Sequence, residues 1–523
     1  MARDTDTEAR QLHEDNVYLN RRITDQNERD GSSDFGQGEQ LGVVHMNSRI
    51  TSYCLMCGIF VSLAAFQTGY KIAELNNPKE SIINCEEKNP GRLPLCLPMT
   101  ENYFAFATSI FAIGALVGSF VAGHLANSYG RKKSILYNNV IYFIGSGLEA
   151  FAVSPLMLVY GRFICGVASG IAVVVTPMYL TEIAPIHSRG SLNMLNQINI
   201  VVGILVSQLM GYFFGNGSQW RIILGLGMGI SALQVILLQN VVESPRFYFI
   251  HNRNKEAEDA LKRLRRINNV TQELNSWVES TSRESEELLE HQGDGGPVSG
   301  VVFNVNASYA EIKHYSIFSI LKERKYRCPL TLAVILQLGQ QFSGINTVFF
   351  YSTSIFSSVF SPELSVVLTL LVGFVNVLCT FVAALVVDKT DRKFLLFASM
   401  GSMFLSLGLL TLATVYNIGY MMVFSIFLVV ASFAPGFGPL PFLIVTEIFD
   451  SKAIAAGSSW SIATNYLGTF LVGSTFFYIQ SLFGKYAFVP FMVLLVFFGV
   501  LYHVLLPETK GRSVEQISRS FRF

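Results

Sequence analysis

Charged residues are scarce in this sequence. Asp, Glu, Lys and Arg make up 14% of the 523 residues, against roughly 25% in soluble domains. The 38 basic and 37 acidic residues nearly cancel, so the chain has no net charge that would attract nucleic acid. These two deficits exclude an ordinary soluble protein and a nucleic-acid-binding protein.

Clustered cysteine and histidine are also missing. The seven cysteines lie mostly in apolar stretches and show no paired C-x-x-C spacing typical of a metal site. Cys54 and Cys57 share an apolar run, so packing explains them better than redox chemistry. Cys85 and Cys96 share one polar loop, and whether they pair stays open. The eight histidines are scattered, and no glycine-rich phosphate loop follows a strand. We therefore expect no enzyme site, no cofactor and no metal.

Long apolar runs are what the sequence has in excess. Twelve runs of about twenty residues are long enough to cross the hydrocarbon core of a bilayer. Only helices and closed barrels satisfy every backbone group there, and runs this continuous predict helices. We therefore expect an all-α integral membrane protein with twelve transmembrane helices. The predicted segments are 53–75, 102–125, 134–153, 156–180, 191–214, 220–242, 329–356, 365–387, 394–415, 420–446, 456–480 and 484–506.

Lys and Arg gather in the loops at one end of these segments, which the positive-inside rule makes the cytosolic end. Both termini are then cytosolic, and residues 1–49 show no signal-peptide pattern. The loop 76–100 and the sequon at Asn216 face the outside or a lumen, so Asn216 is the predicted glycosylation site. The stretch 284–289 fits an acidic dileucine signal, although an amphipathic piece of linker explains it better. The plasma membrane and a vacuolar or endosomal membrane both stay open.

The sequence repeats itself at about half its length. Three motifs that follow a run in the first half recur after the equivalent run in the second half, which predicts two parallel six-helix halves of the kind that rock around a central site. The matched motifs are Gly130-Arg131-Lys132 with Asp391-Arg392-Lys393, Thr181-Glu182-Ile183 with Thr446-Glu447-Ile448, and Glu243-Ser244 with Glu508-Thr509. The predicted domains are an N-terminal tail (1–49), an N-terminal half (50–246), a partly helical cytosolic linker (247–328), a C-terminal half (329–508) and a C-terminal tail (509–523).

Amide side chains recur inside the apolar runs. Gln337, Gln340 and Gln341 share one face of the seventh segment. An amide both donates and accepts hydrogen bonds, which suits an uncharged, hydroxyl-rich solute; an anion would call for Arg or Lys, and a cation for carboxylates. Amides also join membrane helices, at about 1 kcal/mol each, but a Gln-Gln pair on a striped face favours a sugar or polyol site. Further amides in these segments are Asn193, Asn196, Gln197, Asn346, Asn376 and Asn465.

Opposite charges lie at the predicted cytosolic helix ends of both halves. Such charges can hold a transporter in one state and release it in another, whereas positive-inside topology alone explains the Arg but not the Glu residues. Prolines predict breaks in the fourth helix, at Pro177 and Pro185, and in the tenth, at Pro435, Pro439 and Pro441. The predicted gating network consists of Arg131, Glu182, Arg189, Glu243, Arg246, Arg392, Glu447, Glu508 and Arg512.

Seven motifs over residues 53 to 515 resemble the sugar porter family of the major facilitator superfamily, and most of all its hexose facilitators of the glucose transporter type. These motifs are Gly69-Tyr70, Gly130-Arg131-Lys132, Gly161-Arg162, Pro177-Met178-Tyr179-Leu180-Thr181-Glu182, Glu243-Ser244-Pro245-Arg246, Gln340-Gln341-Phe342-Ser343-Gly344-Ile345-Asn346 and Pro507-Glu508-Thr509-Lys510-Gly511-Arg512.

The resemblance implies alternating access, with the sugar held mainly by the C-terminal half. Four positions depart from glucose facilitators: Ala434 stands for a Glu, Phe442 and Tyr466 for two Trp, and Phe350 for the first Tyr of a pair. Asp391 also replaces the Gly of the loop motif. The implied substrate-binding residues are Gln197, Gln340, Gln341, Asn346, Asn376, Asn465, Phe442 and Tyr466.

The mode of transport depends on the first helix. Proton-driven members of the family resemble this chain but carry an Asp that faces an Arg, whereas Lys71 and Arg162 occupy those positions here. The sequence therefore favours facilitated diffusion of a neutral sugar, a hexose or related polyol, across a lipid bilayer. Glu74, at i+3 from Lys71, could pair with either cation, but its position near Lys79 and Glu80 favours an outer-loop acid.

Two alternative functions stay open. One is a proton-coupled sugar symporter. The other is a non-transporting sugar sensor, which would be expected to carry a long cytosolic tail, whereas only about 15 residues follow Glu508. The sequence does not predict an oligomeric state.

Overall fold

The structure is a computed structural model that describes residues 50–84, 93–185, 188–215, 217–271, 273–274, 277, 317–387, 389–449, 453–510 and 517. The chain separates into Met1–Asn47, outside these ranges, and Ser48–Phe523, which holds every helix described below. Asn216, Arg512 and the stretch 284–289 also lie outside the described residues, so the predictions made for them stay predictions.

The described residues contain helices and no strands, and each of the twelve predicted segments corresponds to a helix or to two helices in sequence. Segments seven and ten are each divided in two, into α13 (Arg327–Phe342) and α14 (Ile345–Ser357), and into α17 (Gly419–Phe433) and α18 (Leu440–Ile448). The undivided segments are α2 (Ser52–Ala73), α4 (Glu101–Tyr129), α5 (Arg131–Ala150), α6 (Pro155–Ile183), α7 (Arg189–Phe214), α8 (Trp220–Leu238), α15 (Pro362–Val386), α16 (Arg392–Tyr416), α19 (Ile454–Phe483) and α20 (Val489–Leu505).

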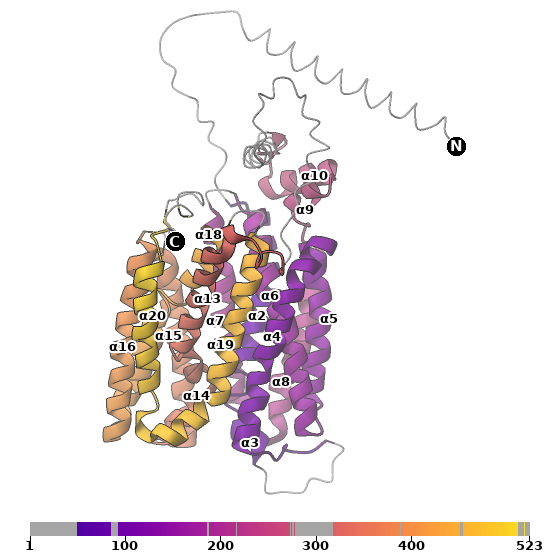
Figure 1. The fold of residues 1–523 in the computed structure, drawn as a ribbon. Helices are drawn as coiled ribbons and strands as arrows, with labels where there is room; N and C mark the ends of the chain where they lie inside the picture. The colour runs from indigo at the N-terminus through magenta and orange to yellow at the C-terminus, as the bar shows by residue number, and fades with distance from the viewer. Residues whose placement is uncertain are drawn as a thin grey trace, which may run out of the picture. The chain divides into compact units, whose positions relative to one another are not determined.

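The helices α2 to α8 form one half of the bundle and α13 to α20 form the other (Figure 1). The short helix α3 (Lys79–Ile83) lies at one end, called here the α3 end. The helices α9 (Pro245–Ile250) and α10 (Asn254–Arg265), which follow the first half, lie at the opposite end, called here the linker end. The twelve-helix, two-half architecture expected from the sequence is therefore confirmed.

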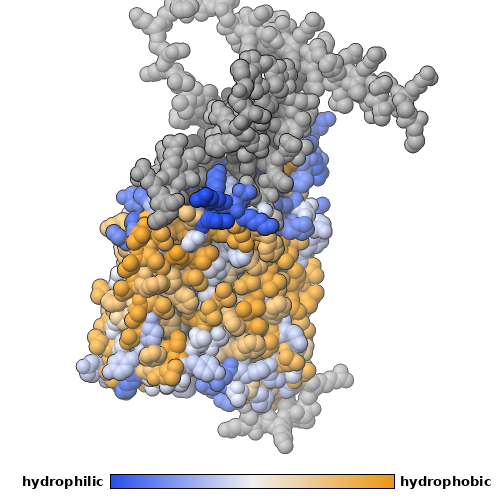
Figure 2. Space-filling model, in the orientation of Figure 1, coloured by the Kyte–Doolittle hydropathy of each residue, from blue (hydrophilic) through white to orange (hydrophobic). Residues whose placement is uncertain are grey.

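A hydrophobic belt lies between the two ends of the bundle on the face shown in Figure 2. Figure 2 shows apolar side chains between two hydrophilic ends of the face in view. Phe381 and Leu385 of α15 and Val504 of α20 are largely exposed. Seven helices are individually long and apolar enough to cross a membrane, or eight if a bent pair within Ala456–Tyr486 counts as one span. The remaining segments fall short of that test because two are divided, α20 is short, and α5 is too polar, with Asn138 and Asn139 near its middle. The belt is where lipid replaces water around the protein.

Side-chain caps begin several of these helices. The hydroxyls of Thr51, Ser154 and Ser361 accept hydrogen bonds from the backbone N–H three residues later, at 3.1, 3.3 and 3.4 Å. Pro155 and Pro362 then occupy the first helical position, where the missing N–H costs nothing because it would have no partner within the helix. Local sequence thus determines where these membrane helices begin.

A stripe of glycines brings α4 and α6 into close contact. A Cβ atom on Gly118 of α4 would lie 2.0 Å from the carbonyl oxygen of Val167, and one on Gly170 of α6 would lie 2.0 Å from that of Ala115. Gly114 and Gly166 repeat the contact one turn away. Small residues let membrane helices approach until their backbones touch, so this stripe holds α4 and α6 together.

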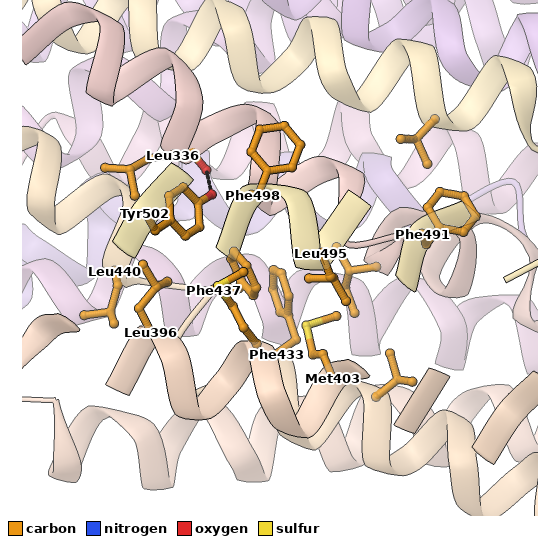
Figure 3. Close-up of a cluster of buried hydrophobic side chains, with 14 of the residues drawn as sticks. Leu336, Leu396, Met403, Phe433, Phe437, Leu440, Phe491, Leu495, Phe498 and Tyr502 are labelled. Atoms are coloured by element: carbon orange, nitrogen blue, oxygen red, sulfur yellow. Dashed lines mark hydrogen bonds between the residues drawn. The ribbon is translucent and has the colours of Figure 1, made fainter. Parts of the chain in front are cut away.

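Both halves have buried apolar clusters, and part of the one in the C-terminal half is drawn in Figure 3. Phe491, Leu495, Phe498 and Tyr502 of α20 are buried among side chains of α13, α16 and α17. The phenol of Tyr502 donates to the carbonyl of Leu336, at 3.1 Å, so the polar atom of this buried ring has a partner.

We predict that Gly118→Ala lowers the melting temperature of the purified protein, because overpacking costs about 1–3 kcal/mol. The matched control is Gly229→Ala in α8, where a new Cβ meets nothing within 4 Å; it should leave the melting temperature unchanged or slightly higher. Equal melting temperatures for the two variants would contradict the packing described for α4 and α6.

Candidate functional site

A cavity lies between the two halves of the bundle. Its empty volume is about 940 Å³, a figure that includes open solvent at its mouth. Helices of both halves line it, and its apolar wall includes Phe111, Phe349, Phe350 and Phe433. The cavity contains all eight residues expected to bind substrate, which are Gln197, Gln340, Gln341, Asn346, Asn376, Asn465, Phe442 and Tyr466.

The amides of the C-terminal half form one hydrogen-bonded network. The amide nitrogen of Asn465 donates to the Oε1 atoms of Gln340, at 2.6 Å, and Gln337, at 2.7 Å. The Oε1 of Gln341 accepts from Asn346 and from the hydroxyl of Thr469, at 3.1 Å. The network holds these side chains in defined rotamers before any ligand arrives.

Gln337 and Gln340 use their amide groups to join protein segments, a role that the sequence did not assign to them. Gln337 is absent from the cavity wall and donates to Ser461 Oγ of α19 at 2.8 Å, so the interhelical role holds for this residue. The amide nitrogen of Gln340 donates to the carbonyls of Phe437 and, at 3.2 Å, Gly438. Gln340 therefore reaches the cavity with both of its amide hydrogens already used.

Gln197 and Asn376 differ from the other amides. They come from opposite halves, on α7 and α15, and no hydrogen bond to the protein is described for either side chain within the described residues. Their donors and acceptors are therefore free to bind a polar ligand in the cavity. Among the cavity amides, this pair has the most unused hydrogen-bonding capacity within the described residues.

Sequence reasoning missed the hydroxyl groups of the cavity. Thr380 and Thr469 line it together with Asn376 and Asn465. Each threonine follows its asparagine by four residues, and that spacing places both side chains on one helix face. The shared Asn-x-x-x-Thr spacing in segments eight and eleven is the signal that could have identified them. Thr68 of α2 also lines the cavity, and no comparable pattern marks it.

The divided helices border the cavity. The break between α13 and α14 falls at Gly344, whose φ of +83° is a left-handed conformation that suits glycine. The break between α17 and α18 spans residues 434–439, as predicted. There the Ser399 hydroxyl of α16 donates to the carbonyl of Ser432, at 2.6 Å, and accepts from the N–H of Phe437, at 3.3 Å. Together with Gln340, it satisfies backbone groups that the break leaves without helical partners.

The predicted break in the fourth helix is wrong. Helix α6 runs without interruption through Pro177 and ends at Ile183, before Pro185. Proline is tolerated inside membrane helices where neighbouring groups compensate. Pro177 has no N–H, so the carbonyl of Val173 loses its helical donor. The Thr181 hydroxyl donates to the carbonyl of Pro177 itself, at 2.7 Å.

Hydrogen bonds between the two halves close the α3 end. The amide nitrogen of Asn76 donates to the carbonyl of Phe349, at 3.1 Å, and to the hydroxyl of Ser352, at 2.9 Å. The hydroxyl of Thr353 donates to Asn77 Oδ1 at 2.8 Å. Deeper in the bundle, the hydroxyls of Ser169 and Tyr466 lie 3.1 Å apart across the halves. These bonds are all between neutral groups.

The linker end carries the same charge arrangement in each half. In the first, Arg131 pairs with Glu182 at 2.7 Å, and Glu243 accepts from the backbone N–H groups of Arg131 and Lys132, at 2.9 and 3.0 Å.

In the second half, Arg392 lies 3.4 Å from Glu447, and Glu508 accepts from the N–H groups of Arg392 and Lys393, both at 3.1 Å. Each of these contacts joins residues of the same half. Arg189 and Arg246, also predicted for this network, have no ion pair described within the described ranges.

The two equivalent glutamates differ in burial. Burial raises the pKa of Glu243, and this effect outweighs its three backbone N–H donors. For Glu508, the weaker effect of burial also acts to raise the pKa, but four backbone N–H groups together hold it below its usual value. Both carboxylates thus cap the start of the helix that follows the repeated loop.

The coupling position is more buried than expected. Glu74 is 1% exposed and pairs with Lys71, at 2.9 Å, and Arg162, at 2.8 Å. Its interpretation as an outer-loop acid is therefore wrong. A further acid, Glu149 of α5, contacts Lys71. Sequence reasoning missed Glu149 because it is a lone charge near the end of an apolar run.

Comparisons with known proteins agree with this fold and site. A family model described as sugar (and other) transporter matches residues 56–521. The human solute carrier family 2 facilitated glucose transporter member 4 is 34% identical over 499 residues, covering 90% of this chain and 91% of the relative. A probable metabolite transport protein of Saccharomyces cerevisiae is 30% identical over 479 residues, covering 89% and 94%.

A solved structure of the xylose transporter XylE from E. coli superposes with a TM-score of 0.69 at 22% identity, covering 88% of this chain and 100% of that chain. At this identity the superposition supports the fold alone. The family match extends over most of the chain, and the family is one of transporters rather than enzymes. The chain belongs to the sugar (and other) transporter family.

Proposed function

We propose that this protein carries a neutral sugar, a hexose or a related polyol, across a membrane by facilitated diffusion with alternating access. The observation that carries the proposal is the pair Gln197 and Asn376, two amides with unused hydrogen-bonding capacity that face one cavity from opposite halves. A sugar that bridges them would join the halves through its hydroxyl groups. Relatives named as facilitated glucose transporters support the same substrate class.

The cavity favours an uncharged solute. Its described lining contains amides, hydroxyls, aromatic rings and aliphatic side chains but no Asp, Glu, Lys or Arg. A charged solute would have to leave water without a counter-ion, which costs far more than burying a hydrogen-bonded hydroxyl. The aromatic wall suits the apolar faces of a sugar ring.

The other residues predicted to bind substrate contribute to different extents. Gln341, Asn346, Asn465 and Tyr466 contribute donors or acceptors that the network leaves over, and Phe442 contributes an apolar surface. Gln340 mainly positions the break between α17 and α18 against the cavity, because its amide hydrogens bind Phe437 and Gly438.

We assign the linker end to the cytosol, since Lys and Arg gather there. The termini are then cytosolic, and the hydrogen bonds of Asn76, Asn77 and Thr353 join the two halves at the end away from the cytosol. Opening to the other side requires those bonds to break while the ion pairs within each half persist. Asn216 would face the outside or the lumen of a plasma, vacuolar or endosomal membrane.

Facilitated diffusion is favoured over the alternatives. Similarity to facilitated glucose transporters supports transport without proton coupling, and it favours a transporter over a non-transporting sensor. Lys71 replaces the carboxylate expected for a proton-coupled symporter.

The first test is uptake of labelled D-glucose, D-fructose and myo-inositol into liposomes that contain the purified protein. We expect saturable uptake of at least one of them. Gln197→Ala and Asn376→Ala should each raise KM by about fivefold to tenfold, because each removes a neutral hydrogen bond of about 1 kcal/mol.

The matched control is Asn199→Ala, on the same helix as Gln197. Asn199 donates to Ser62 Oγ at 2.9 Å and is not part of the cavity wall, so its KM should stay within about twofold of the original, below the cost of one hydrogen bond. No uptake of any solute by the folded protein would contradict the proposed transport. Normal KM values for both cavity variants would contradict the proposed site.

The second test addresses coupling. We expect that an imposed pH gradient neither drives sugar accumulation nor changes the equilibrium sugar concentration in the liposomes, since no exchangeable carboxylate stands at Lys71. A pH-sensitive dye in the lumen measures proton movement. Proton influx that accompanies sugar would identify a symporter instead.

A further inference from the structure

Four charged side chains are buried together near the α3 end of the N-terminal half. They are Lys71 of α2, Glu74 at the end of α2, Glu149 of α5 and Arg162 of α6, and each side chain is 0% exposed. Lys71 Nζ contacts Glu74 Oε2, at 2.9 Å, and Glu149 Oε2. Arg162 Nη1 lies 2.8 Å from Glu74 Oε1 and 4.0 Å from Glu149 Oε1. We call this group the buried tetrad.

Neutral groups enclose the tetrad. Arg162 donates to the carbonyl of Thr108, at 3.3 Å, and Lys71 donates to that of Leu224, at 3.4 Å. The guanidinium of Arg162 lies 4.7 Å from the centre of the Phe111 ring. Phe111 also lines the central cavity. This ring therefore stands between the tetrad and the cavity.

The charges of the tetrad balance. Two cations face two carboxylates, and the other titratable groups close to it are Tyr70 of α2 and Cys165 of α6, which are ordinarily uncharged at neutral pH. The contacts described from α4 and α8 are a carbonyl or a ring in each case. A buried charge is stable only when it is paired. Removing any one member would leave a net charge with no water to solvate it.

The tetrad also holds the segment that closes the α3 end. Arg162 Nη1 donates to the carbonyl of Lys71, at 2.7 Å, in the last turn of α2. Glu74, one of the two acids, is two residues before Asn76, which bonds to α14 of the other half. We call residues 74–77, which include Asn76 and Asn77, the gate segment; its position therefore depends on the tetrad.

We propose that Lys71, Glu74, Glu149 and Arg162 form a permanently ionised anchor for the gate segment. Lys71 is the fixed cation of this anchor: without it, the two adjacent carboxylates of Glu74 and Glu149 would share one bound proton. The charge balance keeps closure of the α3 end independent of pH. The anchor rests on the proposed function only in its role in the transport cycle.

The test is the melting temperature of the purified protein as a function of pH, from about 5.5 to about 8.5, a range in which unpaired exposed acids and lysines do not change charge. Lys71→Met leaves a net negative tetrad that is relieved by binding a proton. The folded variant then holds more protons than the unfolded chain, so its melting temperature should fall as pH rises.

Glu149→Gln leaves a net positive tetrad that is relieved by losing a proton, so its melting temperature should rise with pH. The two changes in melting temperature are expected to have opposite signs. Between about pH 5.5 and about pH 8.5, each should amount to about 3 °C or more relative to the original protein. The double variant Lys71→Met/Glu149→Gln restores neutrality and should follow the pH profile of the original protein.

The matched control is Gln67→Met, which removes a fully buried polar group one turn from Lys71. Gln67 donates to the carbonyl of Gly227 and the hydroxyl of Ser231, at 2.9 and 2.7 Å, and carries no charge. It should lower the melting temperature by a similar amount at every pH. If the melting temperature of Gln67→Met changed with pH as that of Lys71→Met does, the proposal would be overturned. It would also be overturned if neither Lys71→Met nor Glu149→Gln showed a pH-dependent melting temperature relative to the original protein.

If neither single variant folds, the double variant decides. A folded double variant supports charge balance, and a double variant as unstable as the single ones contradicts it. The same proteins can be assayed for sugar uptake, where Lys71→Met should lose activity with rising pH and Glu149→Gln with falling pH. Opposite slopes in melting temperature with no uptake by the original protein would support the anchor and reject the proposed transport. Sugar uptake by the original protein, without those pH-dependent melting temperatures in the variants, would support the proposed transport and reject the anchor.

Discussion

No water reaches the backbone inside a bilayer, so every N–H and C=O in the belt must find its partner within the protein. Most find it within a helix. Where α17 gives way to α18, the helical partners are lost, and Ser399 and Gln340 replace them. The helix can be irregular at that point because it borders the cavity rather than lipid. The irregular backbone and the cavity therefore occur together because only protein groups or water in a cavity, and not lipid, can satisfy backbone groups that have left a helix.

The same constraint governs charge. The linker-end charges lie where water is close, and the glutamates of both halves serve there as caps for helix starts. The buried tetrad lies where water is absent, and its four charges satisfy one another. One broken pair of this kind costs roughly 3–5 kcal/mol, which is comparable with the stability of a domain. Such a cluster is stable only while its charges balance.

The described contacts within each half are stronger than those between the halves. Ion pairs and buried apolar clusters hold each half together internally, and a glycine stripe adds to the packing of the first half. The bonds described between the halves at the α3 end are neutral hydrogen bonds, each worth about 1 kcal/mol. Rocking of one half against the other would break only the weaker class. The cavity amides Gln197 and Asn376 lie across this interface, so a bound solute could bias which side opens.

The sequence by itself determined the helices, the two-half architecture and most of the amides that face the cavity. These features depend on local periodicity: a run of about twenty apolar residues must be a helix, and the face of an amide stripe follows from 3.6 residues per turn. Only the tertiary structure decided what each face meets. It turned Gln337 toward Ser461, left α6 unbroken at Pro177, and buried Glu74 with Glu149, a residue 75 positions later in the chain. Partners across helices come from distant segments, and no local pattern in one segment records which neighbour will pack against it.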